Sequence, residues 1–149
     1  MIYMNTWTSI ATFTNQRIQE IVANGVTPAN SVLMFDWENS TNIEEAPAFH
    51  LVGPASLGIE EVSPGIHHVS FVIGVGSFND EGLHTHRQMV DLIYNSVKSG
   101  TRIAVYNATT ESEYSWLKLT DGTGVAPMTR SNTRALQFIQ AEGLLDPLA

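Results

Sequence analysis

The chain has 149 residues, a length typical of a single domain with one hydrophobic core over residues 1–149. Apolar residues make up 43%, and charged residues only 15%, below the roughly 25% that is typical of soluble domains. Its formal charge of −8 opposes attraction to phosphate backbones, and no window approaches the apolar length of a membrane span, so we expect neither sequence-specific nucleic-acid binding nor membrane insertion. The absence of cysteine excludes disulfides, thiolate nucleophiles and cysteine-based zinc sites.

The N-terminal segment has helical periodicity. Apolar residues recur at helical spacing from Thr8 to Asn24, and Gly25 is placed to end the predicted helix. The short apolar run from Val32 to Phe35 is typical of a buried strand. The opening residues Met1 to Trp7 lack the basic-then-apolar order of a signal peptide, so we expect the protein to stay in the cytoplasm in which it is made.

A long irregular region is expected from Glu38 to Gly65, because prolines and glycines punctuate it throughout. Within it, only Ala48 to Val52 is predicted to be able to pair as a strand. The region also gathers carboxylates, namely Glu38, Glu44, Glu45, Glu60 and Glu61. Paired carboxylates can act as general acid and base, but a solvated acidic loop is the favoured interpretation. Such a loop would add little to a monomer's core, so we expect it to serve assembly.

Period-two alternation is clearest from Ile66 to Ser77, where one face of the predicted strand is apolar and the other is polar or bare. The apolar positions are Val69, Phe71, Ile73 and Val75. A helix is predicted from Glu81 to Ser99, and Gly100 is placed to end it. Asn79 or Asp80 can cap its first turn. Its apolar stripe comprises Leu83, Val90, Ile93, Tyr94 and Val97.

The C-terminal part reads as further strands. Ile103 to Tyr106 and Tyr114 to Leu119 are both predicted strands, and Thr120 to Gly124 is predicted to be the turn that reverses the chain. The segment from Thr133 to Glu142 fits either a capped helix or an alternating strand, and both remain open. The fold class is therefore α+β: a mixed, mostly antiparallel sheet packed by two amphipathic helices, in the order α-β-β-α-β-β before this last segment.

Four histidines invite a metal hypothesis, namely His67, His68, His84 and His86. Residues two apart on a helix point away from each other, and neighbours on a strand face opposite sides, so a structural role is the favoured interpretation. Gly74-Val75-Gly76 followed by Ser77 resembles a phosphate-binding loop only superficially, and no G-x-S-x-G motif is present. We therefore expect no catalytic residue, cofactor or metal.

The segment from Ile66 to Gly100, a strand through Gly74-Val75-Gly76 leading into a helix, resembles the tail terminator proteins of tailed bacteriophages. The helix in this comparison bears His86, Arg87, Val90, Asp91, Tyr94 and Val97. The stretch from Arg134 to Phe138 is similar to a final strand in that family. The resemblance implies a virion structural protein that forms a homohexameric ring, caps the tail tube and joins it to the neck.

The partners implied by the resemblance are further copies of the chain, the tail tube protein, a neck or connector protein and, where the tail has one, a sheath protein. Contacts with them are expected at Glu44, Glu45, Phe49, Glu60, Glu61, His68, Arg87 and Trp116. Of the three tryptophans, Trp7, Trp37 and Trp116, one or two would anchor such an interface. The alternative is a small cytoplasmic metal-dependent enzyme or ligand-binding domain that uses the four histidines.

Overall fold

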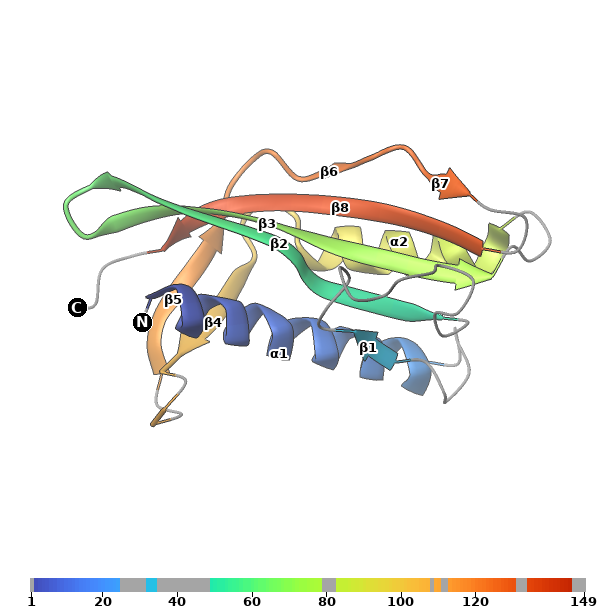
Figure 1. Ribbon diagram of the computed structural model, residues 1–149, viewed down its shortest axis with the longest axis horizontal. Coiled ribbons are helices and arrows are strands. Elements are labelled where there is room, and N and C mark those ends of the chain that lie inside the picture. Colours follow the sequence, from blue (N-terminus) through green and yellow to red (C-terminus); the bar gives the residue numbers. More distant parts are fainter. Residues whose placement is uncertain are drawn as a thin grey trace.

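The computed structural model describes residues 2–24, 32–34, 49–78, 83–107, 109–110, 113–130 and 134–145. The fold is α+β, with two helices and a curled, mostly antiparallel sheet (Figure 1). The elements in chain order are α1 (Ile2–Ala23), β1 (Val32–Met34), β2 (His50–Ser63), β3 (Ile66–Phe78), α2 (His84–Ser96), β4 (Arg102–Tyr106), β5 (Glu113–Leu119), β6 (Gly124–Val125), β7 (Thr129–Arg130) and β8 (Arg134–Leu145). Within the described residues, no helix combines the length and apolarity that crossing a membrane requires.

The sheet has the strand order β1-β2-β3-β8-β5-β4, and β6 and β7 also pair with β8. Among the described strands, β1 alone runs parallel to its partner, β2. The long strands β3 and β8 pair over their whole length, from Phe78 opposite Arg134 to His67 opposite Leu145. This pair is the centre of the sheet (Figure 1).

Helix α1 begins at Ile2, six residues before the predicted start at Thr8. The first turns of the helix, which were not predicted, bury the polar side chains Asn5 and Thr6. A search for periodic apolar residues does not detect buried polar residues. Further along, the helix buries Ile10, Ile18 and Ile21 in the core. The predicted stop, Gly25, lies outside the described residues.

The predicted irregular region from Glu38 to Gly65 is wrong where the structure describes it, because β2 occupies His50–Ser63. Leu51 and Val52 are fully buried, and β2 pairs with β3 from His50 to Ser63 across two register shifts. This strand was predicted as a loop because it contains glycines and Pro54, which are typical of turns. Proline is tolerated there because Pro54 falls within the register shift between Val52 and Ser56, where the pairing of β2 with β3 is interrupted.

The expectation that this region adds little to the core is therefore also wrong for residues 49–65. Leu51 belongs to the central core cluster, and Phe49, Leu57 and Ile59 pack against it. The earlier part of the predicted loop, including Glu38 and Pro47, lies outside the described residues, as does Trp37 before it.

Strand β3 confirms the predicted alternation. Val69, Phe71, Ile73 and Val75 are all buried and belong to one core cluster. The glycines of the other face have a packing role, because a side chain at Gly74 would meet the Phe138 ring at 3.2 Å and one at Gly76 would overlap the His50 ring. Rings from the two neighbouring strands thus lie over bare backbone.

Helix α2 is shorter than predicted, running from His84 to Ser96, and Leu83 precedes it in the left-handed conformation at φ 56°. The proposed caps Asn79 and Asp80 lie outside the described residues. Inward-facing residues of the helix are His86, Met89 and Ile93. Tyr94, assigned to the apolar stripe, is 37% exposed, so that assignment is wrong.

The C-terminal segment is a strand, β8, so the helical alternative for Thr133 to Glu142 is wrong. The segment from Thr120 to Gly124 does not reverse the chain as predicted. Strands β5, β6 and β7 all run antiparallel to β8, and their partners move steadily along it from Leu145 to Ala135. Residues 117–130 thus follow one edge of β8, with a bend around Gly122 at φ 122°.

Candidate functional site

The first pair of histidines lies on the hairpin of β2 and β3, where each ring meets a different carboxylate. His67 Nε2 is 3.7 Å from Glu61 Oε2, and His68 Nε2 is 3.4 Å from Glu142 Oε2. The two contacts lie on opposite faces of β3, because adjacent strand residues point to opposite sides. No single ion can therefore join His67 and His68.

The second pair is separated in the same way. His84 is exposed at the first residue of α2, while His86 is fully buried. Across the residues that the structure describes, no group of three or more histidines and carboxylates is placed to hold a metal ion. The four histidines thus occupy four different environments, and the geometry that the metal-enzyme alternative needs is not found in this part of the chain.

His86 lies in a chain of hydrogen bonds that ties α2 to the sheet. Gln137 Nε2 donates to the carbonyl oxygen of Ala126 at 2.9 Å, which leaves Gln137 Oε1 to accept from His86 Nε2, 3.0 Å away. With the ring proton on Nε2, His86 Nδ1 accepts from the hydroxyl of Ser77 at 2.8 Å. The chain connects β3, α2, β8 and the segment between β6 and β7.

A serine hydrogen-bonded to a histidine is also found in hydrolytic triads, but the environment of Ser77 and His86 differs from that of a triad. A nucleophilic serine must reach substrate, whereas Ser77 is 1% exposed and His86 is 0% exposed. The third member is the neutral amide of Gln137 rather than the carboxylate that stabilises an imidazolium. We therefore assign Ser77, His86 and Gln137 a structural role in fixing α2 on the sheet.

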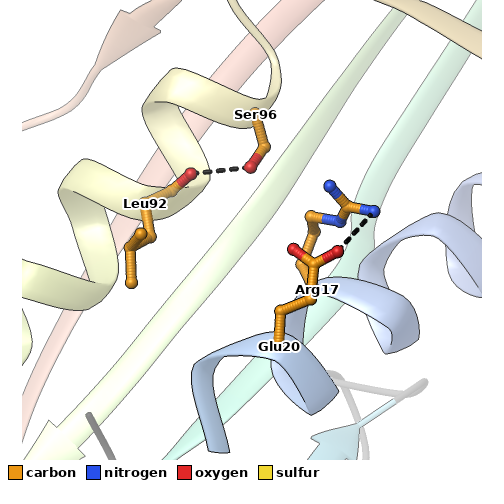
Figure 2. Close-up of polar contacts among 4 residues, drawn as sticks. All are labelled: Arg17, Glu20, Leu92 and Ser96. Atoms are coloured by element: carbon orange, nitrogen blue, oxygen red, sulfur yellow. Dashed lines mark hydrogen bonds and ion pairs between the residues drawn. The ribbon is translucent and has the colours of Figure 1, made fainter. Parts of the chain in front are cut away.

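Two of the hollows that the described residues line are small, and neither is built as a ligand site. The first lies between the helices, where Arg17 and Glu20 of α1 form an ion pair at 3.2 Å near Leu92 and Ser96 of α2. Figure 2 shows these four residues. Ser96 Oγ donates to the carbonyl oxygen of Leu92 at 2.7 Å, and the guanidinium of Arg17 lies 4.8 Å from the centre of the Phe13 ring. The cavity measures about 30 Å³, the space of one water molecule.

The second hollow lies on the face of the sheet that carries Ser70 and Glu142. It measures about 160 Å³ and is bordered by Ser56, Ser70 and Gln140. It is open to solvent along one side, and Glu142, the charged residue in its lining, is already paired with His68. Its shallow shape and the paired carboxylate do not indicate a particular ligand.

The predicted contact residues fall into separate groups. Glu60, Glu61 and His68 come together on the hairpin of β2 and β3, with both carboxylates exposed. Trp116 is on β5 and is 40% exposed. Arg87 is exposed on α2, away from the hairpin, and Phe49 is half-buried against the core. Glu44 and Glu45 lie outside the described residues.

The feature that sequence reasoning missed is a row of side chains across the whole sheet. Directly opposed residues in five strands are, in order, Glu60, His68, Leu144, Lys118 and Arg102. Opposed residues in antiparallel strands point to the same face, so these five share one surface, which we call the charged row. Only the strand register reveals it, because its members are spread over the chain from residue 60 to residue 144.

Comparison with known proteins adds no identification. No protein-family model matches the chain, and no curated protein matches it in sequence. The functional argument therefore depends on the geometry described above.

Proposed function

We propose that the protein is a structural subunit of a tailed bacteriophage, a tail terminator that forms a homohexameric ring, caps the tail tube and joins it to the neck. Assembly takes place in the host cytoplasm and the product is part of the virion. The proposal includes the predicted fold detail that two amphipathic helices pack on a mostly antiparallel sheet. The partners are other copies of the chain, the tail tube protein, a neck or connector protein and, in a contractile tail, a sheath protein.

The observation that carries the proposal is the tip of the hairpin between β2 and β3, which we call the hairpin arm (residues 60–68). The arm extends to the side of the molecule beyond both helices (Figure 1). Its outermost residues, from Glu60 to Gly65, are all exposed. Among the described strands, β8 pairs with β3 only as far as His67, so the tip of the arm from Val62 to Ile66 is two-stranded. A two-stranded ribbon in water is only marginally stable, so this tip gains order when a partner covers it.

A free strand edge supports the same function. Strand β1 pairs with β2 only at residues 50–52, so within the described residues the outer edge of β2 from Ser56 to Ser63 has no strand partner. Such an edge presents unpaired N–H and C=O groups that another protein can extend. The separation of the four histidines described above also favours a structural protein over the metal-dependent alternative.

The proposal is tested by tube length. Tail tube protein of the same virus, polymerised with and without this chain, is measured by electron microscopy. Because a terminator occupies the growing end, tubes formed in its presence should be shorter and should carry an extra ring of density at one end. Tubes of unchanged length without added density, at a molar excess of the chain, would contradict the proposal. The same chain with Glu60 and Glu61 of β2 changed to alanine tests contact through the arm, because this variant should remain folded and shorten the tubes less than the parent chain.

A further inference from the structure

The charged row changes sign from one side of the sheet to the other. Its β2 end carries Glu60, and its opposite end carries Lys118 and Arg102, while Glu61, the next residue of β2, points to the other face beside His67. All four of these side chains are exposed. Between the two ends lie His68 and the 36% exposed Leu144. One chain thus presents an acidic end, Glu60, and a basic end, Lys118 and Arg102, on the same surface of the sheet.

Each end of the row coincides with an end of the sheet. The acidic end is the outer edge of β2, which has no strand partner beyond residue 52 among the described strands. The basic end is β4, which is the last strand in the sheet order. The backbone N–H of Tyr106 at the far end of β4 donates to Ser9 Oγ at 3.0 Å, so α1 covers that end and leaves the Arg102 end as the accessible one.

We propose that the acidic β2 edge of one copy docks beside the basic β4 edge of the next copy, so that the charged rows of neighbouring subunits join end to end. The proposal depends on the ring-forming function above and names its subunit contact. A head-to-tail contact of this kind joins two different surfaces, and repeated contacts close into a ring when the rotation between copies allows it.

A second copy is the occupant that the charges favour. The Glu60 carboxylate would face the cationic groups of Arg102 and Lys118, while Glu61 adds negative charge on the other face of the same strand edge. Opposite charges across an interface select the partner and its register. Trp116 lies two residues from Lys118 on β5 and is 40% exposed. A large aromatic beside the basic end supplies the apolar area that exposed ion pairs, which contribute little by themselves, do not provide.

Charge exchange tests the contact directly. Variant one carries Glu60→Lys and Glu61→Lys, and variant two carries Arg102→Glu and Lys118→Glu. Each variant alone places like charges at every contact, so each should associate at least about tenfold more weakly than the parent in sedimentation experiments at low salt. Mixed in equal amounts, the two variants have complementary contacts in both directions, so the mixture should regain the parent's mass.

The control carries Asp91→Lys and Lys98→Glu, which are exposed charges on and just after α2. It should keep the parent's mass, and thermal unfolding should show that all variants are folded. An assembled parent whose mass is unchanged in both variants would overturn the contact and leave the ring proposal standing. Weakened variants whose mixture stays small would also overturn it, because the two ends would then not face each other. A parent that is monomeric at every concentration would overturn both proposals.

Discussion

Phe71→Ala should lower the free energy of unfolding by about 3–5 kcal/mol, the range for a large aromatic removed from a packed core. Phe71 is 1% exposed at the middle of β3, and its opposed neighbours are Leu57 in β2 and Ala141 in β8. Alanine at this position would leave a cavity that the two flanking strands cannot close. Denaturant unfolding of the variant and the parent measures the difference.

The matched control for Phe71 is Val62→Ala in the hairpin arm, since Val62 is 53% exposed. That change should alter the unfolding free energy by less than about 0.5 kcal/mol. If Phe71→Ala is too unstable to purify, Phe71→Leu should give a smaller loss of about 1–2 kcal/mol. A loss below about 1 kcal/mol for Phe71→Ala itself would show that β3 does not pack as described.

Gly143→Ala should cost about 3 kcal/mol, at the upper end of the range for added bulk in a tight core. A methyl group at this position would lie against the carbonyl oxygen of Lys118, with the Cα of Leu119 only 3.0 Å away. These atoms are backbone and cannot rotate aside. Strand β5 would have to move away from β8, although backbone hydrogen bonds hold it there, such as Thr120 N–H to the Glu142 carbonyl at 2.9 Å.

Gly124→Ala is the matched control, because Gly124 also pairs with β8 but has its nearest atom, Gln140 Cγ, at 3.8 Å. An added methyl group there makes an ordinary contact, and we expect a change within about 0.5 kcal/mol. Thermal unfolding of the two variants side by side measures the contrast. Equal stability of Gly143→Ala and Gly124→Ala would show that β5 and β8 do not approach as closely as described.

The sequence predicted those elements whose burial follows one simple period. The alternation of Val69, Phe71, Ile73 and Val75 was sufficient to identify β3, because both neighbouring strands keep that face in the core. The beginning of α1 was missed because Asn5 and Thr6 are polar and still buried. Whether a polar residue is buried depends on its partners in the folded structure, and the periodicity of the sequence carries no information about those partners.

Strand β2 was mistaken for a loop because the physical reasons for its proline and its glycines are not local. Gly53 is close-packed against Thr14 of α1, where a side chain would overlap the threonine. Gly58 and the exposed carboxylates Glu60 and Glu61 lie in the part of β2 whose outer edge has no strand partner among the described residues, and there the apolar alternation fades. The sequence signals of a loop and of an exposed edge strand are therefore similar.

Only part of the candidate site could be predicted from the sequence. Glu60, Glu61 and Trp116 were predicted contact residues from their charge and size, and all three are exposed. Their connection through Lys118 and Arg102 required the register of β2, β3, β8, β5 and β4. The role of His86 likewise required Ser77 and Gln137, which are separated from it by 9 and 51 positions.

The most direct test of the central claim is the solution mass of the unmodified chain, measured by sedimentation equilibrium over a wide concentration range. The chain has a mass of 16.3 kDa. A ring-forming subunit predicts one closed species of about six copies that does not grow further with concentration, because a closed ring has no free contact left. A 16.3 kDa monomer across the whole range would contradict the account, and so would unlimited growth into filaments.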